Sequence, residues 1–300
     1  MELWVPITLV AAFMQNLRSA LQKHLKGSLS TYGATFCRFV YAVPLALVYV
    51  AVLGEGYGFE WPEPNPRFAL FAMLGGLAQI TATALLVYLF SLRNFAVGTT
   101  YSKTETVQTA IFGLVILGEP VSSLATLAIL ISLVGVMSIS AAKSRLTLRN
   151  LLLGWTGRAA FIGMLSGTFF GLSAVAYRAA ALSLGGEGFL MQAAFTLACV
   201  LVFQTAVMAV WIRAREPGEL TRVIRGWRVA SLVGISGMIG SVGWFSAMTL
   251  ENAAYVRAVG QVELVFTFIA SYFFFRERST PLEIGGILLI VAGIVILLLG

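Results

Sequence analysis

Long apolar runs, separated by short polar stretches, occupy most of the chain. Each run holds about 20 residues, the length that an α-helix needs to cross the hydrocarbon core of a bilayer. The runs are continuously apolar and lack the alternation of lipid-facing strands, so they predict helices rather than a β-barrel. Ten spans are predicted, at residues 4–22, 31–53, 68–92, 97–117, 121–141, 159–183, 188–212, 228–250, 254–275 and 280–299. The predicted fold class is an all-α polytopic membrane protein.

The composition agrees with a membrane environment. Of the 300 residues, 59% are hydrophobic and 11% are charged, against about 45–50% and 25% in globular domains. The net charge of +7 is spread between the apolar runs and forms no basic patch, so no nucleic-acid partner is expected. Cys37 and Cys199 lie within apolar runs and are interpreted as buried hydrophobic residues. Motifs for metal binding or ATP hydrolysis do not occur, so neither a cofactor nor an enzymatic activity is predicted.

An internal repeat relates the two halves of the chain. Residues 67–136 align with residues 225–294 without a gap, at a constant offset of 158 residues. The alignment pairs Glu105 with Glu263 and Gly135 with Gly293, among other positions. We therefore expect a first five-helix repeat at 1–142, a basic connecting loop at 143–158 and a second five-helix repeat at 159–300.

The charges predict how the two repeats lie in the membrane. A repeat of five helices is odd-numbered, so the second copy enters the bilayer from the opposite side. Most lysines and arginines fall on alternate connections, whereas glutamates predominate on the others. By the positive-inside rule, the basic face is cytoplasmic and both termini are outside. Inverted repeats of this kind are typical of secondary transporters, which bind solutes near the bilayer midplane.

Two motifs carry a resemblance to a known family. GEP (118–120) precedes the fifth predicted helix, and RERSTPLEIGG (276–286) opens the tenth. With the five-plus-five repeat, they resemble the EamA family of the drug/metabolite transporter (DMT) superfamily, and most of all its YddG-type amino-acid exporters. The resemblance implies a ten-helix carrier of the bacterial cytoplasmic (inner) membrane. It also implies a central cavity lined mainly by the third, fourth, eighth and ninth helices.

Ionisable residues inside the predicted spans are the first candidates for a site. A charge at mid-bilayer costs about 2.5–3.5 kcal/mol, so such residues usually face the protein interior or water. Glu105 lies about 12 Å into the fourth helix, and Glu263 is its repeat equivalent on the ninth. One hypothesis is that these acids bind the ammonium group of a zwitterion or relay protons. The alternative is that they form ion pairs that stabilise the bundle, with partners among Arg18, Arg38, Arg178 and Arg257.

Helical spacing assigns faces to some of these residues. Lys103 and Glu105 lie about 200° apart on a helix, so one is expected to face the cavity and the other a packed helix. Tyr101, Glu105 and Gln108 share a face, as do Arg257 and Gln261. The full set of predicted substrate-binding residues is Gln15, Gln79, Tyr88, Tyr101, Lys103, Glu105, Gln108, Tyr177, Trp244, Arg257, Gln261 and Glu263. The uncharged members can instead form interhelical hydrogen bonds.

Small residues and a proline indicate how the helices pack. Gly163, Gly167 and Gly171 recur at every fourth position and predict a seam for close helix packing. Pro44 predicts a kink in the second helix.

Three functions are compatible with these features. The favoured one is an exporter of small metabolites, amino acids above all and neutral and aromatic ones included, that works by alternating access. A carrier of sugar phosphates or other phosphorylated metabolites would need converging cations, which Lys103 and Arg257 can supply. An intramembrane enzyme or assembly factor is the third and is disfavoured by the lack of catalytic pairings. The expected partners are a small-molecule substrate and the lipid bilayer, and the oligomeric state is left open, a monomer included.

Overall fold

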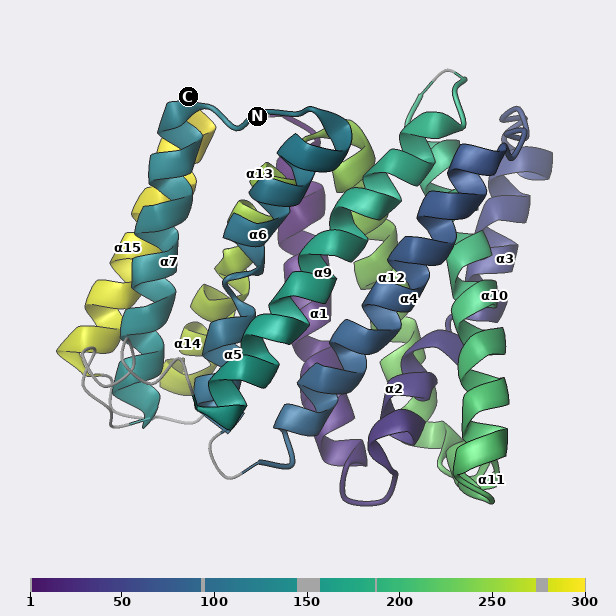
Figure 1. Ribbon diagram of the computed structural model, residues 1–300, viewed down its shortest axis with the longest axis horizontal. Helices are drawn as coiled ribbons and strands as arrows, with labels where there is room; N and C mark the ends of the chain where they lie inside the picture. The colour runs from purple at the N-terminus through teal and green to yellow at the C-terminus, as the bar shows by residue number, and fades with distance from the viewer. Residues whose placement is uncertain (1, 93–94, 145–156, 187, 274–279, 300) are drawn as a thin grey trace.

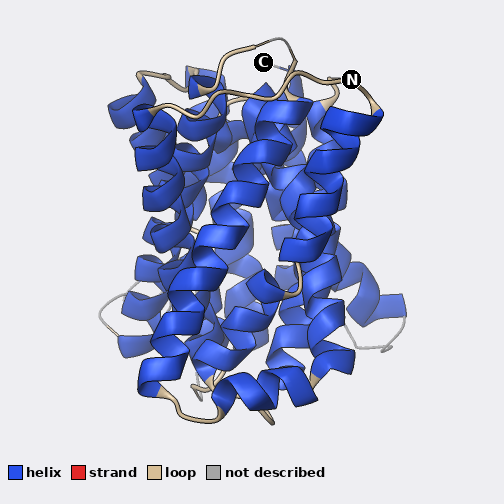
Figure 2. Cartoon of the chain, turned by 90° about the vertical axis from the view of Figure 1, so that its right-hand side faces the viewer, coloured by secondary structure: helices blue, strands red, loops and turns tan. Residues whose placement is uncertain are grey.

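The computed structural model describes residues 2–92, 95–144, 157–186, 188–273 and 280–299. In this part of the chain every regular element is helical and no strand occurs (Figures 1 and 2). The helices run roughly parallel to one another between two ends of the molecule, called the upper and lower ends after their position in Figure 1. Helix α1 begins and helix α15 ends at the upper end, so both termini lie there.

The helical elements follow the predicted apolar segments closely. The long ones are α1 (Trp4–Leu25), α4 (Pro66–Leu89), α7 (Ser123–Ser144), α9 (Arg158–Ser183), α10 (Leu190–Arg215), α12 (Trp227–Leu250) and α15 (Pro281–Leu299). The shorter ones are α2 (Thr31–Val40), α3 (Val43–Ala51), η1 (Val52–Gly56), α5 (Phe95–Ser102), α6 (Glu105–Phe112), η2 (Gly113–Leu117), α11 (Glu219–Arg225), α13 (Ala253–Val259), η4 (Gly260–Val262) and α14 (Glu263–Phe273).

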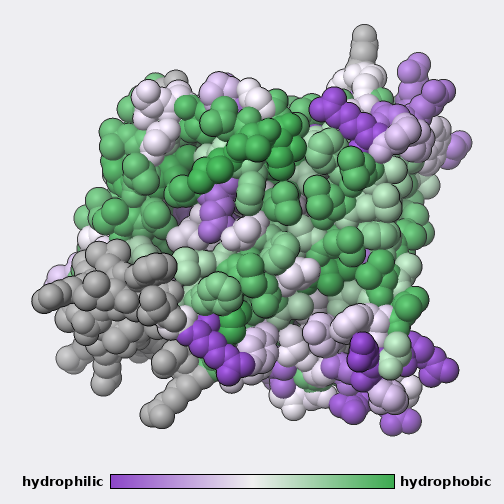
Figure 3. Space-filling view, viewed as in Figure 1, coloured by the Kyte–Doolittle hydropathy of each residue, from purple (hydrophilic) through white to green (hydrophobic). Residues whose placement is uncertain are grey.

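Seven of these helical stretches are long and apolar enough to cross a membrane. They are the joined stretch of α2, α3 and η1, together with α4, α7, α9, α10, α12 and α15. Figure 3 shows a broad hydrophobic zone across the middle of the molecule and hydrophilic side chains toward its upper and lower edges. This distribution is the one that a bilayer requires of a protein that crosses it several times.

The three remaining predicted spans are more polar or are interrupted. Helix α1 is long enough, but Gln15, Asn16 and Arg18 lower its hydropathy. The prediction of continuous helices at 97–117 and 254–275 is wrong, because a turn divides α5 from α6 and the 3₁₀ turn η4 divides α13 from α14. The second predicted helix is also divided, between Val40 and Val43, with Pro44 in the first turn of α3. Helix α11, near the lower end, was not predicted.

Antiparallel helix pairs build the bundle. Helix α4 packs along α9, α1 along α12, and α7 along α15, while α10 lies against α2 and α3. Helix α9 also runs parallel to α5 and α6, and the predicted glycine seam forms this contact. A Cβ atom on Gly163 would lie 2.0 Å from the carbonyl oxygen of Gly98, and one on Gly167 would lie 2.7 Å from that of Ser102. Glycine is therefore needed where α9 packs against the interrupted segment of α5 and α6.

Gly163→Ala is expected to destabilise the protein, because the added methyl group overlaps the backbone of α5. Overpacking of this kind costs about 1–3 kcal/mol, and the apparent unfolding temperature in detergent should fall by several degrees. Gly285→Ala is the matched control, since a Cβ atom there meets nothing within 4 Å and alanine favours the helix by up to about 1 kcal/mol. Equal unfolding temperatures for the two variants would contradict the seam.

Candidate functional site

A cavity of about 180 Å³ lies where the polar segments meet. It reaches from the helix breaks at Glu105 and Glu263, in the middle of the bundle, to Phe90 at the lower end of α4. Its polar lining consists of Gln15, Asn16, Arg18, Ser19, Thr99, Thr100, Ser102, Lys103, Glu105, Ser140, Arg257, Glu263 and Thr267. Elements from both halves of the chain therefore contribute to one polar chamber.

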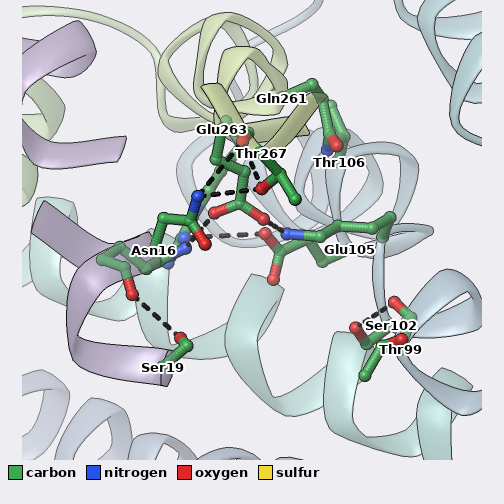
Figure 4. A network of polar contacts seen from close by, with 12 residues as sticks. Asn16, Ser19, Thr99, Ser102, Glu105, Thr106, Gln261, Glu263 and Thr267 are labelled. Carbon is green, nitrogen blue, oxygen red and sulfur yellow. Dashed lines mark hydrogen bonds and ion pairs between the residues drawn. The ribbon is translucent and has the colours of Figure 1, made fainter. Parts of the chain in front are cut away.

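The break between α5 and α6 determines how two of the charges point. Helix α5 ends at Ser102, residues 103–104 form a turn, and α6 begins at Glu105. Side-chain hydroxyls satisfy backbone carbonyls at this break, because Ser102 donates to the carbonyl of Thr99 (Figure 4) and Thr104 donates to that of Tyr101. The expectation that Lys103 and Glu105 face different surroundings is wrong, since both line the cavity. That expectation assumed a continuous helix, and the turn removes the rotation on which it rested.

Lys103 forms an ion pair with Glu263 across the two halves. The second carboxylate oxygen of Glu263 accepts a hydrogen bond of 2.9 Å from the Gln15 amide of α1. Asn16, on the next position of α1, donates to Thr267 at 2.8 Å (Figure 4). The carboxylate of Glu263 is thus held by α1 and by the α5–α6 turn together.

Glu105 meets Arg257 in a looser contact. One guanidinium nitrogen of Arg257 lies 3.6 Å from a carboxylate oxygen of Glu105, beyond hydrogen-bond distance. The guanidinium also lies 4.8 Å from the centre of the Trp244 ring, a separation typical of a cation–π contact. Both charged side chains are buried. Glu105 therefore keeps carboxylate lone pairs that no described side chain fills.

A second, narrower cavity adjoins the first and shares Gln15, Phe170 and Arg257 with it. Its walls include the predicted residues Gln79, Tyr177 and Trp244. The Tyr177 hydroxyl donates to the Gln79 amide oxygen at 3.1 Å, and Gln204 of α10 donates to the same oxygen at 3.0 Å. Gln204 was not predicted. These polar groups form a buried network between α4, α9 and α10.

Four predicted residues line neither of these cavities. Tyr88 accepts a hydrogen bond from Arg158 near the lower end, and Tyr101 is buried in the packed interior. Gln108 donates to Thr104 in its own segment. Gln261 donates to Thr106 at 2.7 Å and so ties η4 to α6. Helical spacing placed Tyr101, Gln108 and Gln261 near the charged residues, but the breaks in their two segments alter that spacing. Tyr88 lies on the unbroken helix α4, near its lower end.

Arg18 and Arg38 line the two cavities. From the sequence they were expected only as ion-pair partners of the glutamates. Arg18 lies in the main cavity and Arg38 in the narrower one. The signal for Arg18 is its spacing, because Gln15, Arg18 and Ser19 fall on one face of α1. In the described part of the chain, neither arginine forms an ion pair with a carboxylate.

Arg178 forms several contacts at the opposite, upper end of the bundle. Its Nε donates to both carboxylate oxygens of Glu119 at 2.9 Å. Its Nη1 donates to the backbone carbonyls of Met248 and Glu251 at 2.7 and 2.6 Å. This arginine therefore joins α9 to the turn before α7 and to the connection between α12 and α13. Glu119, rather than Glu105 or Glu263, is its ion-pair partner.

The lining of the main cavity is suited to binding small polar solutes. Across the residues described, no three histidine, cysteine or acidic side chains gather in a way that would hold a metal ion. The cavity instead presents carboxylates, ammonium and guanidinium groups, amides and hydroxyls. Such groups recognise small polar solutes.

Comparison with known proteins supplies a family and a fold. The model of the EamA-like transporter family matches residues 2–141 and, a second time, residues 157–299. A solved structure, described only as the crystal structure of a protein, is similar with a TM-score of 0.71 and 16% sequence identity; the alignment covers 99% of this chain and 97% of that one. Comparison with curated proteins finds no match. At this identity the structural likeness shows the fold alone.

The Lys103–Glu263 contact is expected to couple the two halves energetically. Lys103→Met and Glu263→Gln should each lower the free energy of unfolding, and the double variant should lose less than the sum, with a coupling of about 0.5–3 kcal/mol. Unfolding of purified protein in detergent measures this cycle. Lys26→Met is the control, because Lys26 lies near the lower end of α1 and donates to Thr31. Strict additivity of the two changes would contradict an energetic role for the pair.

Proposed function

Because the chain belongs to the EamA-like transporter family, we propose that it is a secondary carrier that exports amino acids across the bacterial cytoplasmic membrane. The proposed mechanism is alternating access, in which the cavity between the two halves opens in turn to each side of the bilayer. The lipid bilayer is its environment, and one chain is sufficient for the proposed cycle.

The observation that carries the amino-acid assignment is the mixture of charges in the main cavity. An amino acid at neutral pH carries an ammonium group and a carboxylate, so its site needs partners of both signs. Glu105 offers lone pairs to the ammonium group, since its contact with Arg257 is long at 3.6 Å. Arg18 lines the same cavity and presents a guanidinium group to the carboxylate.

Reciprocal contacts support two inverted five-helix repeats. A Cβ atom on Gly135 would lie 2.6 Å from the backbone oxygen of Gly286, and one on Gly293 would lie 2.7 Å from that of Ala128. At the repeat offset, Gly135 corresponds to Gly293 and Ala128 to Gly286. When each residue is replaced by its repeat equivalent, the first contact becomes the second and the second becomes the first. Contacts related by a two-fold axis behave in this way. At the same offset, α1 corresponds to α9 and α12 corresponds to α4. The pair formed by α1 and α12 is therefore the repeat equivalent of the pair formed by α9 and α4.

The two ends of the bundle differ in a way that suits alternating access. The cavity extends to the lower end, whereas Arg178 and Glu119 join α9 to two connections at the upper end. Basic residues are concentrated at the lower end, in the last turns of α1 and α10 and in α11. By the positive-inside rule the lower end is cytoplasmic. In the proposed cycle, this arrangement is the state that receives solute from the cytoplasm.

Counterflow in proteoliposomes tests the function directly. Vesicles loaded with an unlabelled amino acid should accumulate the same labelled amino acid, with saturable kinetics. Glu105→Gln should lower this uptake by about tenfold or more, because a charged hydrogen bond contributes about 1.5–3 kcal/mol. The panel includes threonine, methionine, phenylalanine and acidic amino acids.

Glu283→Gln is the matched control for the loss of a carboxylate. Glu283 lies in the first turn of α15 and contacts Thr280, outside the cavity. It should transport like the native protein. Saturable counterflow that survives Glu105→Gln unchanged would remove Glu105 from the site, and a failure to transport any amino acid would refute the assignment.

The contact of Arg178 with Glu119 is expected to hold the upper end shut. In a background with Cys37→Ala and Cys199→Ala, Ser19→Cys places a thiol in the cavity. A membrane-impermeant maleimide should label this thiol in inside-out vesicles much faster than in intact cells. Glu119→Gln should raise the rate in intact cells by about tenfold, because it removes a charge-assisted hydrogen bond that stabilises the closed end.

Glu55→Gln is the control for this experiment, since Glu55 also lies at the upper end and is exposed. Its labelling rate in intact cells should equal that of the parent. Unchanged labelling in Glu119→Gln would show that other contacts close this end.

A further inference from the structure

Two arginines from different helices lie side by side against α12. Arg18 of α1 and Arg38 of α2 are 2% and 4% exposed. Both side chains pass over Gly237, where an added Cβ atom would lie 3.5 Å from Cδ of Arg18 and 3.5 Å from Cγ of Arg38. The aliphatic stems of the two arginines therefore lie next to each other on α12, and the side chains line adjoining cavities.

Within the described residues, neither of these arginines forms an ion pair with a carboxylate. Arg38 donates one hydrogen bond of 3.0 Å to the Thr83 hydroxyl and lies 5.4 Å from the centre of the Phe39 ring. The Nε–H of Arg18 is buried and meets no acceptor. An arginine keeps its charge in proteins, and buried charges are normally paired. Two adjacent buried guanidinium groups of this kind call for an anion.

The charges of the two cavities give the same result. Together they contain four cationic side chains, Arg18, Arg38, Lys103 and Arg257, and two carboxylates, Glu105 and Glu263. Glu263 pairs with Lys103 and Glu105 with Arg257. Arg18 and Arg38 are therefore the cationic excess. The buried Nε–H of Arg257 and the indole N–H of Trp244 are further donors without acceptors, so the walls offer more donors than the described acceptors satisfy.

We infer that Arg18 and Arg38 form an oxyanion-binding subsite and that the transported solutes carry net negative charge. This inference rests on the proposed amino-acid carrier and specifies its substrates as amino acids with a second acidic group. The planar guanidinium group matches the oxygens of a carboxylate or a phosphate. The ammonium group of such a solute lies toward Glu105, and its two anionic groups, the α-carboxylate and the additional acidic group, lie toward the two arginines. A neutral amino acid would leave the cationic excess uncompensated.

Pairs of amino acids with nearly equal shape and different charge test the inference. Counterflow is measured for aspartate against asparagine, glutamate against glutamine, and O-phosphoserine against serine. The acidic member of a pair should be transported about tenfold or more better than the neutral one, as expected from one charged hydrogen bond. Preference for aspartate and glutamate assigns a carboxylate to the subsite, and preference for O-phosphoserine alone assigns a phosphate.

Substitutions connect this preference to the two arginines. Arg18→Gln and Arg38→Gln should each abolish the discrimination between acidic and neutral members, whereas Arg18→Lys should retain part of it. Arg158→Gln is the control, because Arg158 is exposed and donates to Tyr88 near the lower end. It should preserve the discrimination.

Unfolding measurements separate binding from scaffolding. Without solute, Arg18→Gln should unfold at the same temperature as the native protein or at a higher one, since it removes a buried charge that has no ion-pair partner among the described residues. A marked loss of stability would show that Arg18 is a structural residue and would overturn the inference. Millimolar aspartate or O-phosphoserine should stabilise the native protein and leave Arg18→Gln unaffected.

The remaining outcomes distinguish this inference from the proposed function. Equal or better transport of the neutral members would refute the oxyanion subsite while supporting the amino-acid carrier. Uptake of a sugar phosphate but of no amino acid, lost in Arg18→Gln, would refute the amino-acid function and support the subsite. A lack of uptake of every solute tested would refute both.

Discussion

A charge within the hydrocarbon layer is tolerated only where it meets an opposite charge, a hydrogen-bonding group or water. The centre of this protein is organised by that constraint. Lys103 and Glu105 come from one half of the chain, and their ion-pair partners, Glu263 and Arg257, come from the other. Each half thus carries intramembrane charges that it does not pair internally. Ion pairing brings the halves together around a polar chamber, and the proposed solute site lies among the same groups.

Because charges in the hydrocarbon layer must be paired or solvated, the helices divide into an apolar class and a polar class. Helices such as α7 and α15 are apolar, pack through glycines at Gly135, Gly286 and Gly293, and present large hydrophobic side chains outward. The polar segments α1, α5–α6 and α13–α14 are too polar or too interrupted to resemble ordinary membrane spans. Free backbone groups at a helix break are acceptable at membrane depth only where they are buried in protein or face a polar cavity. The breaks beside Glu105 and Glu263 therefore mark the place where the cavity forms.

Sequence patterns predicted the long helices well and the centre of the site less well. Continuous apolar runs locate α4, α9, α10 and α12 within a few residues, because length and hydrophobicity decide those elements. Glu105, Arg257 and Glu263 were recognised as intramembrane charges, and Arg257 was among the ion-pair partners considered for the glutamates, but the pairing of Glu263 with Lys103 was not predicted. The prediction that Lys103 and Glu105 face different surroundings was wrong because it used the rotation per residue of a continuous helix. A turn lies between these two residues, so that rotation does not apply. Nothing in the sequence of residues 99–110 (TTYSKTETVQTA) requires that turn. Tertiary contacts of α5 and α6 with the glycines of α9 stabilise it. The same limit hid Arg38, whose position beside Arg18 depends on how α1 and α2 pack against α12.

The two halves obey the repeat in packing and depart from it in chemistry. The glycine contacts between α7 and α15 are reciprocal, and these helices lie apart from the charged groups. At the centre, Lys103 forms an ion pair with Glu263. Gln261, the repeat equivalent of Lys103, instead donates a hydrogen bond to Thr106. A two-fold framework gives a carrier two related faces to open, because exchange of the repeat conformations yields the opposite state. A small solute with distinct ends has no two-fold axis, and a symmetric site would bind it in two competing orientations. In the proposed carrier, departure from symmetry among the polar residues would select one orientation of the solute. The reciprocal packing of the apolar helices would still let the framework open to both sides.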